Sequence, residues 1–333
     1  MKDFIKKNFC IKIILGAWLT LSFAMLVRDN AIAAELTPYF WNWGGGAVSN
    51  LMDAKQQMGL QSATIAFVTS GGDCTDDRST LAMSADIEEF IASGGMVIVS
   101  FGGAAGTYIE TACTDEDQLF SLIDNIIQRL GTQRLDFDVE GSQLSDASAT
   151  GRRTRVLARL QSKYPNLYVS FTLPVGPGGL PSAAVNLLKS TAAGGVHIGV
   201  INIMTMNYGS GTTNLGDVAI QSAEPTVLQL ISIYPSMTSV QRYAMMGITP
   251  MIGVNDDGTV FTVSDAEKIA NHVNQRRIGR LSYWALQRDQ KGTDIASSSG
   301  TQQSKFAYYL AFMQACQGGI GGPARELPCR TNK

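Results

Sequence analysis

The chain has 333 residues, 45% of them hydrophobic and 16% charged, and its net charge is −2 at pH 7. A chain this apolar folds as a globular protein, and its length suits one large domain or two small ones. The slightly acidic balance excludes a strongly basic binding surface, so no nucleic-acid partner is expected. The two His residues stand outside any HExxH or paired CxxC motif, so neither a metal site nor a cofactor is expected.

Residues 1–34 have the pattern of a secretory signal peptide. Four lysines precede an uncharged run over 13–27, and small residues that suit cleavage follow over 31–34. A membrane anchor is the alternative, but this run is shorter than the roughly 20 residues that a spanning helix needs, and Arg28 and Asp29 close it. We therefore expect a secreted, extracellular protein without a stable membrane anchor, which would cross a periplasm where the cell has one.

Eight apolar, β-branched runs follow along the mature chain, each beside turn signals. They span 37–43, 63–68, 96–101, 134–140, 167–174, 200–207, 247–253 and 280–286. Between most of them lie helical patterns, such as those over 85–95 and 115–131, with apolar residues three and four apart and a glycine at the end. Eight strand–helix units predict an α/β fold, a (β/α)8 TIM barrel of parallel strands; an open doubly wound sheet usually has fewer strands. We assign the barrel to 35–310 and a short C-terminal tail to 311–333.

The fourth run, LDFDVEG over 135–141, places Asp136, Asp138 and Glu140 on alternate residues. In a barrel strand these side chains would point inward while the apolar residues between them pack against the helices. Like charges in a low-dielectric interior cannot all ionise, so at least one carboxyl group would hold a proton, as a general acid must. A solvated acidic face and a set of cation ligands are the alternatives. Glu140 would lie at the C-terminal end of its strand, where barrel enzymes carry their active sites.

This acidic strand resembles the signature D-x-x-D-x-D-x-E of glycoside hydrolase family 18, the chitinases. Four further stretches agree with the family in order: VSFGG (99–103) is similar to its S-x-G-G, MTMNYG (204–209) to its M-x-M-D-Y-G, GITPMIGVND (247–256) to the seventh strand of a bacterial branch, and LSYWALQRD (281–289) to the last strand. Two departures stand out. Gln133 and Arg134 replace an Asp-Gly pair at the start of the motif, and Asn207 replaces an Asp; it can hydrogen-bond a substrate amide but carries no charge.

The resemblance implies a substrate-assisted mechanism, in which the N-acetyl group of the sugar replaces a second catalytic carboxylate. Glu140 would protonate the glycosidic oxygen and then act as base toward water. Asp138 would orient the acetamido group and stabilise the oxazolinium ion, and Asp136 would exchange a proton or a hydrogen bond with Asp138. Tyr208 would donate a hydrogen bond to the acetamido oxygen, although a capping role for this aromatic residue is the alternative.

The same resemblance implies the substrate-binding residues. Met206 and Asn207 would shape the acetamido pocket, and Trp284 would lie under the apolar face of the sugar. Trp41 and Trp43 end the first predicted strand, where Trp43 would suit a stacking subsite. Packing in the core is the alternative for each tryptophan.

The implied function is that of a secreted chitinase, which hydrolyses β-1,4-linked N-acetylglucosamine polymers or oligomers with retention of configuration, as a monomer. An endo-β-N-acetylglucosaminidase acting on N-glycans and a catalytically weak chitin-binding lectin are the alternatives. Some members insert a small α+β domain in the segment that corresponds to 253–280, and this segment has no room for it. We therefore expect an open groove and endo-type cleavage.

Four cysteines remain in the mature chain, an even number in an oxidising setting. Cys74 follows the second predicted strand and Cys113 follows the third, so the two would be neighbours at the rim of the active site and form a disulfide. Cys316 and Cys329 would form a second disulfide that ties the tail.

Overall fold

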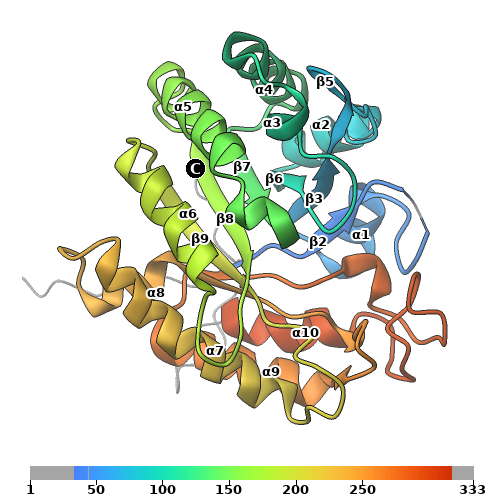
Figure 1. The fold of residues 1–333 in the computed structure, drawn as a ribbon. Coiled ribbons are helices and arrows are strands. Elements are labelled where there is room, and N and C mark those ends of the chain that lie inside the picture. The colour runs from blue at the N-terminus through green and yellow to red at the C-terminus, as the bar shows by residue number, and fades with distance from the viewer. Residues whose placement is uncertain (1–33, 44, 317–333) are drawn as a thin grey trace, which may run out of the picture. The chain divides into compact units, whose positions relative to one another are not determined.

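A computed structural model of the protein describes residues 34–43 and 45–316, all within one compact unit. A closed sheet of parallel strands lies at its centre, and helices surround the sheet (Figure 1). The strands of this sheet follow in the order β1 (Glu35–Leu36), β13 (Arg280–Leu281), β10 (Met246–Thr249), β9 (Ile198–Met204), β8 (Tyr168–Pro174), β7 (Arg134–Asp138), β6 (Met96–Gly102), β3 (Ser62–Val68) and β2 (Tyr39–Trp41).

The sheet closes because its two end strands are consecutive pieces of the chain. β1 pairs with β13 and β2 pairs with β3, so both belong to the first strand of a barrel. The other pairings are parallel as well. Every one of the eight predicted runs overlaps a strand of this barrel, and the predicted (β/α)8 fold is confirmed.

Each barrel strand is followed by at least one helix. The helices are α1 (Leu51–Met58), α2 (Ser84–Ala92), α3 (Ile109–Ala112), α4 (Glu116–Leu130), α5 (Ala147–Lys163), α6 (Ser182–Ala193), α7 (Leu215–Gln229), α8 (Ser239–Met245), α9 (Val263–Arg276) and α10 (Ala307–Met313). In α4, Asp115 caps the first turn by accepting from two backbone N–H groups, and Gly131 ends the helix with a left-handed φ of 64°. Both signals were readable in the sequence.

The alternation of the acidic strand separates two environments. Leu135, Phe137 and Val139 are buried in the main core between the sheet and the helices. Asp136 and Asp138 are 1% and 4% exposed on the other face of β7, inside the barrel. The predicted orientation of this strand is therefore correct.

The segment between the seventh and eighth barrel strands is short. It forms a small antiparallel hairpin, β11 (Gly253–Val254) with β12 (Val260–Phe261), followed directly by α9. Thr262 and Asp265 form a capping box that starts this helix. The predicted lack of an inserted α+β domain here is confirmed.

The predicted disulfide between Cys74 and Cys113 is present, with 4.4 Å between the Cα atoms. It joins the loop between β4 (Ser70–Gly72) and β5 (Thr75–Asp76) to the residue that ends α3. Cys329 lies outside the described residues, so the second predicted disulfide stays a prediction.

The predicted boundary between barrel and tail, at 310/311, is wrong in its position. It falls inside α10, whose Phe312 is buried and stacks on Tyr283 with 5.2 Å between the ring centroids. Because the packed aromatic residues continue past the boundary, the barrel's last helix reaches Met313. The predicted signal peptide lies outside the described residues except for Ala34, and the structure describes no helix long and apolar enough to cross a membrane.

Candidate active site

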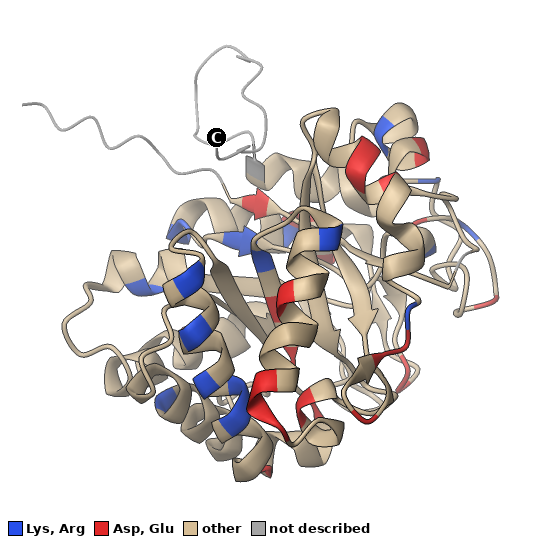
Figure 2. Ribbon diagram, turned by 90° about the horizontal axis from the view of Figure 1, so that it is seen from above, with Lys and Arg blue, Asp and Glu red and all other residues tan. Residues whose placement is uncertain are grey.

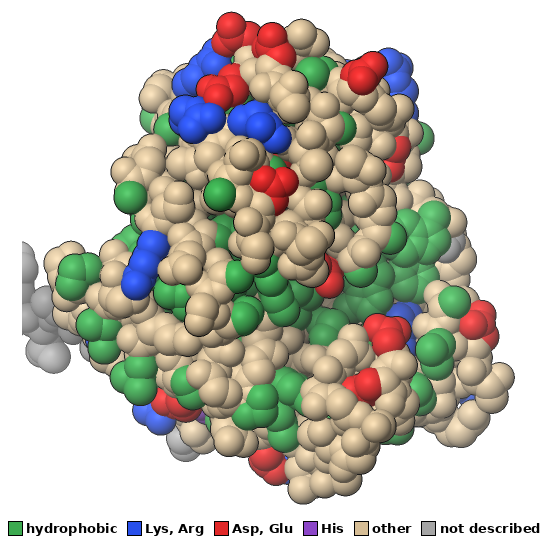
Figure 3. Space-filling view, in the orientation of Figure 1, with side chains coloured by type: hydrophobic (Ala, Val, Ile, Leu, Met, Phe, Trp, Pro, Cys, Tyr) green, Lys and Arg blue, Asp and Glu red, His purple; other side chains and the backbone are tan. Residues whose placement is uncertain are grey.

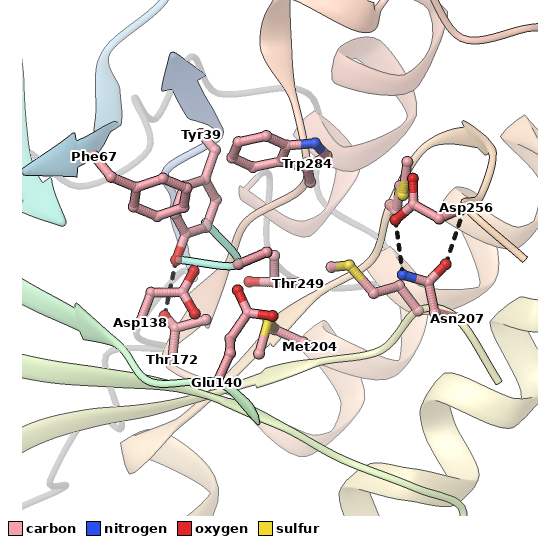
Figure 4. A pocket seen from close by; sticks show the side chains of 13 residues that line it. Tyr39, Phe67, Asp138, Glu140, Thr172, Met204, Asn207, Thr249, Asp256 and Trp284 are labelled. Atoms are coloured by element: carbon pink, nitrogen blue, oxygen red, sulfur yellow. Dashed lines mark hydrogen bonds between the residues drawn. The ribbon is translucent and has the colours of Figure 1, made fainter. Parts of the chain in front are cut away.

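A pocket of about 270 Å³ opens at the C-terminal ends of the barrel strands. Its lining combines aromatic, carboxyl, hydroxyl and thioether side chains (Figure 4): Tyr39, Phe67, Ala104, Asp138, Glu140, Thr172, Met204, Met206, Asn207, Thr249, Met251, Asp256 and Trp284. Five predicted residues meet there: Asp138, Glu140, Met206, Asn207 and Trp284. Apolar walls with a few convergent polar groups are typical of a small-molecule or sugar site.

Asp136 lies beneath this pocket and is saturated with hydrogen bonds. The hydroxyl groups of Ser100, Ser170, Thr172 and Tyr39 lie 2.6 to 3.2 Å from its two oxygens. Burial raises the pKa of the Asp136 carboxyl group, and the hydrogen bond from Ser170 acts in the opposite direction. Hydroxyl donors converging on both oxygens favour the carboxylate form.

Asp138 lies above it with far fewer partners. Its Oδ1 is buried and has no hydrogen-bond partner, and the side chain lines the pocket. Burial raises the pKa of Asp138 well above its ordinary value, and the charges of Glu140 and Asp136 raise it further. Asp138 is therefore the member of the row that most readily holds a proton.

Glu140 stands at the mouth of the barrel. β7 ends at Asp138, and Glu140 precedes a short 3-10 helix, η2 (Gly141–Ser145), so it leaves the sheet and reaches the pocket. Burial raises the pKa of Glu140, and the charge of Asp256 raises it further. A half-buried carboxyl group with a raised pKa keeps its proton to higher pH than an exposed one, which suits a general acid.

Asp256 and Asn207 form a closed pair across the pocket from Glu140 (Figure 4). Asn207 Nδ2 donates to Asp256 Oδ2 at 3.0 Å, and the backbone N–H of Asp256 donates to Asn207 Oδ1 at 3.0 Å. An aspartate at position 207 would place a second negative charge against Asp256, whereas the amide supplies the donor and acceptor that the pair needs. This pairing gives a physical reason for the departure at position 207.

We expect Asp256→Asn to move the alkaline limb of the pH profile of kcat/KM to lower pH. Removing the negative charge lowers the pKa of Glu140, so its acidic form is lost earlier as the pH rises. At the pH where wild-type kcat/KM has fallen to half on that limb, the variant retains less than half of its own maximum. Asp257→Asn is the control, because Asp257 bonds to Thr259 and Gly209. An equal displacement in both variants would contradict the assignment.

Tyr108 holds the backbone beneath the two pocket carboxyl groups. Its hydroxyl oxygen lies 2.9 Å from the carbonyl oxygen of Asp138 and 3.0 Å from that of Gly103, and it accepts from the backbone N–H of Glu140 at 2.9 Å. Tyr108 is buried at the start of α3, which ends at the disulfide. One hydroxyl group thus fixes the backbone that carries both Asp138 and Glu140.

We expect Tyr108→Phe to lower kcat about tenfold while KM changes less than about twofold, because a misplaced acid slows the reaction more than it weakens binding. Steady-state kinetics would measure both. Tyr308→Phe is the matched control, since its hydroxyl donates to the Phe261 carbonyl oxygen at 2.8 Å and Tyr308 does not line the pocket. A loss of thermal stability with unchanged kcat in Tyr108→Phe would show that the hydroxyl group is only structural.

The contacts of Ser100 and Gly102 with the acidic strand explain the residues of the S-x-G-G stretch. Ser100 donates to Asp136 at 2.8 Å. Gly102 has a φ of 102°, and a Cβ atom there would lie 2.3 Å from the carbonyl oxygen of Asp138. Only glycine permits both this backbone angle and this close approach of β6 to the catalytic strand.

Aromatic rings form one wall of the pocket. Phe67 and Trp284 stack with 5.6 Å between their centroids and an angle of 9°. Trp41 and Trp43 stack beside them at 5.4 Å and 10°, and Trp43 is 60% exposed whereas Trp41 is 3% exposed. Trp41 is therefore a packing residue, and Trp43 presents its face outward.

A second hollow of about 350 Å³ adjoins the first. The two share Phe67, Ala104 and Trp284, and Trp43 lines the second. Figure 3 shows a recess with largely hydrophobic walls and acidic groups at its edge. The two hollows form a continuous groove with stacking surfaces for more than one sugar ring.

Tyr208 does not occupy the position that the resemblance implied. Its hydroxyl group lies 3.0 Å from Ser222 Oγ of α7, its ring packs against the main core, and it is absent from the pocket lining. The chain turns at Asn207, whose φ of 55° is left-handed, and Tyr208 therefore faces the helix layer. Its placement favours the capping alternative.

Several pocket residues were not predicted: Tyr39, Phe67, Thr172, Thr249 and Asp256. Tyr39 and Phe67 lie within or at the end of predicted strands, but nothing in the sequence separates pocket aromatics from core aromatics. Asp256 stands in the stretch GITPMIGVND that supported the resemblance, and its place after a predicted strand was the available signal. Among the described residues, no group of three or more His, Cys, Asp or Glu side chains is arranged to hold a metal ion.

No protein-family model matches the chain. A probable bifunctional chitinase/lysozyme of Escherichia coli K12 is 31% identical over 251 residues, which are 69% of this chain and 28% of that protein. Endochitinase 11 of Metarhizium anisopliae is 31% identical over 245 residues, 68% of this chain and 47% of that protein. The chain thus spans less than half the length of either curated relative.

The fold agrees closely with a solved catalytic domain. Active domain 2 of the thermostable chitinase from Pyrococcus furiosus, solved as catalytic site mutants complexed with chito-oligosaccharides, superposes with a TM-score of 0.77 at 29% identity. The match covers 85% of this chain and 94% of that domain. The acidic strand, the glycine that ends β6 and the tryptophan after β13 lie around one pocket, and with these similarities to chitinases the resemblance to glycoside hydrolase family 18 is confirmed.

Proposed function

We propose that the protein is a secreted chitinase that hydrolyses β-1,4-linked N-acetylglucosamine chains with retention of configuration. The observation that carries this proposal is the row of three carboxyl groups, in which Asp136 is saturated with hydrogen bonds, Asp138 presents a buried, unpaired oxygen and Glu140 stands at the pocket mouth. The chitinases of E. coli, M. anisopliae and P. furiosus to which the chain is similar support the substrate class.

The different environments of the three groups support a separate role for each. Glu140, held in its acid form, donates a proton to the glycosidic oxygen as the bond from that oxygen to the anomeric carbon breaks. The acetamido carbonyl oxygen of the same sugar bonds to the anomeric carbon and gives an oxazolinium ion, so no protein carboxylate needs to act as nucleophile. The chain beyond the cleaved bond leaves as an alcohol.

Asp138 supplies the charge that this intermediate needs. It passes its proton to Asp136 and, as a carboxylate, accepts the acetamido N–H and faces the positive oxazolinium ion. Glu140, now a carboxylate, takes a proton from water as the water oxygen attacks the anomeric carbon from the face that the leaving group vacated. The ring opens with the original configuration, and the proton returns to Asp138.

Trp284 and Trp43 support binding of an extended chain. Trp284 lies between the two hollows, so one sugar stacks on it beside Glu140 and further sugars continue toward the exposed face of Trp43. Only a short hairpin and one helix occupy 253–280, with no inserted domain, and this supports an open groove and endo-type cleavage. One chain forms the whole pocket, in keeping with a monomer, and the pattern over 1–34 supports export.

Product analysis on chito-hexaose tests this proposal against its alternatives. We expect the wild-type protein to release dimers, trimers and tetramers together from the earliest times. Release of dimers alone would refute endo-type cleavage. Cleavage of the chitobiose core of an N-glycan in place of chito-hexaose would establish an endo-β-N-acetylglucosaminidase, and binding of chito-hexaose without any product would establish a lectin.

A further inference from the structure

A cluster of three charges, one buried and two partly buried, lies at the end of the barrel opposite the pocket. Glu35 of β1 pairs with Arg134 of β7, with 2.5 Å between Oε1 and Nη2, and with Arg280 of β13, with 3.0 Å between Oε2 and Nη2. Acidic and basic strand segments meet at the N-terminal end of the barrel strands (Figure 2). The side chain of Arg280 is 2% exposed, so this cation lies inside the barrel.

Arg280 is connected to the catalytic strand through one hydroxyl group. Its Nη1 donates to Ser170 Oγ at 2.9 Å, and Ser170 Oγ donates to Asp136 Oδ1 at 2.6 Å. Ser170 and Asp136 are both buried, so water does not screen this connection. A cation fixed one hydroxyl group away favours the charged form of Asp136 over its neutral form.

We propose that Arg280 is a positioning residue that keeps Asp136 as a carboxylate, so that the proton shared by the two aspartates resides on Asp138. The inference rests on the proposed function, in which Asp136 must be free to accept that proton. Arg280 touches neither the pocket nor the substrate and acts through Ser170 and Asp136. This role also gives a physical reason for a buried charge at the start of the last barrel strand.

None of the other named groups that face Asp136 carries a positive charge, so Arg280 is the one that can stabilise its carboxylate form by charge. Tyr39 of β2 and the hydroxyl groups on β6 and β8 are neutral donors, and Asp138 on the same strand is acidic. Burial raises the pKa of Asp136, the hydrogen bond from Ser170 lowers it, and the positive charge of Arg280 lowers it as well. Glu35 in turn offsets part of the charge of Arg280.

Two variants of this cluster have opposite expected effects on the acid limb of kcat/KM, where protonation of Asp136 ends activity. Arg280→Gln removes the cation, so the limb moves to higher pH. Glu35→Gln keeps an acceptor for Arg280 but leaves its charge less offset, so the limb moves to lower pH. At the pH where wild-type kcat/KM is half-maximal on this limb, we expect about a tenth of the maximum in Arg280→Gln and about nine tenths in Glu35→Gln.

Two further variants separate this role from structural damage. Arg134→Gln removes the other ion pair of Glu35 without touching Ser170, so it destabilises the fold but moves the limb less than Arg280→Gln. Ser170→Ala removes the connection and moves the limb to higher pH, which keeps the test open if Arg280→Gln fails to fold. Thermal unfolding of each variant gives its loss of stability.

The result that would overturn the inference is a displacement of the limb in the same direction in Arg280→Gln and Glu35→Gln, or in neither. Failure of the proposed function is a different outcome. It would appear as a wild-type protein that cleaves no chito-oligosaccharide at any pH. If only the inference fails, the wild type is active, and replacing the charged residues of the cluster does not move the acid limb of kcat/KM as expected.

Discussion

Replacing Glu140 by Gln is expected to lower kcat on chito-oligosaccharides by about 10³-fold, with KM changed less than about threefold, because general acid–base catalysis contributes factors of this size. Glutamine keeps the shape of the side chain but has no proton of suitable acidity for the glycosidic oxygen. Single-turnover kinetics on a fluorogenic chitobioside, with binding followed by tryptophan fluorescence, would separate the two effects.

Glu116→Gln serves as the control for that variant. Glu116 lies at the start of α4 and pairs with Arg155 at 2.6 Å, away from the pocket, so its replacement should leave kcat unchanged. Unaltered kcat in Glu140→Gln would remove Glu140 from the mechanism and leave the pocket without an acid.

Asp138→Asn is expected to lower kcat about 10² to 10³-fold, the loss that follows removal of one electrostatic partner of a charged intermediate. Stability should behave differently. The folded-state pKa of Asp138 is raised well above its ordinary value, so ionisation of this carboxyl group destabilises the folded state as the pH rises above the unfolded-state pKa. Asparagine does not ionise, and the variant should unfold at the same or a higher temperature near neutral pH.

Asp289→Asn is the comparison for Asp138→Asn. Asp289 is also buried, but it accepts from the backbone N–H groups of Tyr308 and Tyr309 and so caps α10. Its replacement should lower the unfolding temperature and leave kcat unchanged. If Asp138→Asn instead lost stability and kept its activity, Asp138 would be a structural residue.

Much of the fold could be predicted from the sequence because two periodicities dominate the sequence: alternation of side chains in strands, and apolar residues three and four apart in helices. Apolar runs bounded by turn residues marked the eight strands, and helix starts such as Asp115 and ends such as Gly131 marked the units between them. The alternation in LDFDVEG also determined which face of β7 is polar. Side chains along a strand alternate between its two faces, so once the apolar residues pack against the helices the carboxyl groups must point into the closed barrel.

Features that depend on contacts between distant segments were not readable. Tyr208 faces α7 because the backbone turns at Asn207, and a motif does not encode that turn. Arg280 and Glu35 lie 245 positions apart in the chain, and Arg280 reads as an ordinary polar residue at the start of a strand. The tail boundary was misplaced because the burial of Phe312 depends on its stacking with Tyr283, which has no local signal.

The central claim is that the N-acetyl group of the sugar replaces a second carboxylate. Two measurements on the same enzyme test it most directly. Proton NMR gives the anomeric form of the first products from chito-hexaose, and an assay on a de-N-acetylated hexamer shows whether the N-acetyl group is needed for cleavage. The predicted result is product in the β-anomeric form from chito-hexaose and no cleavage of the de-N-acetylated chain. Product in the α-anomeric form, or equal cleavage of both chains, would contradict it.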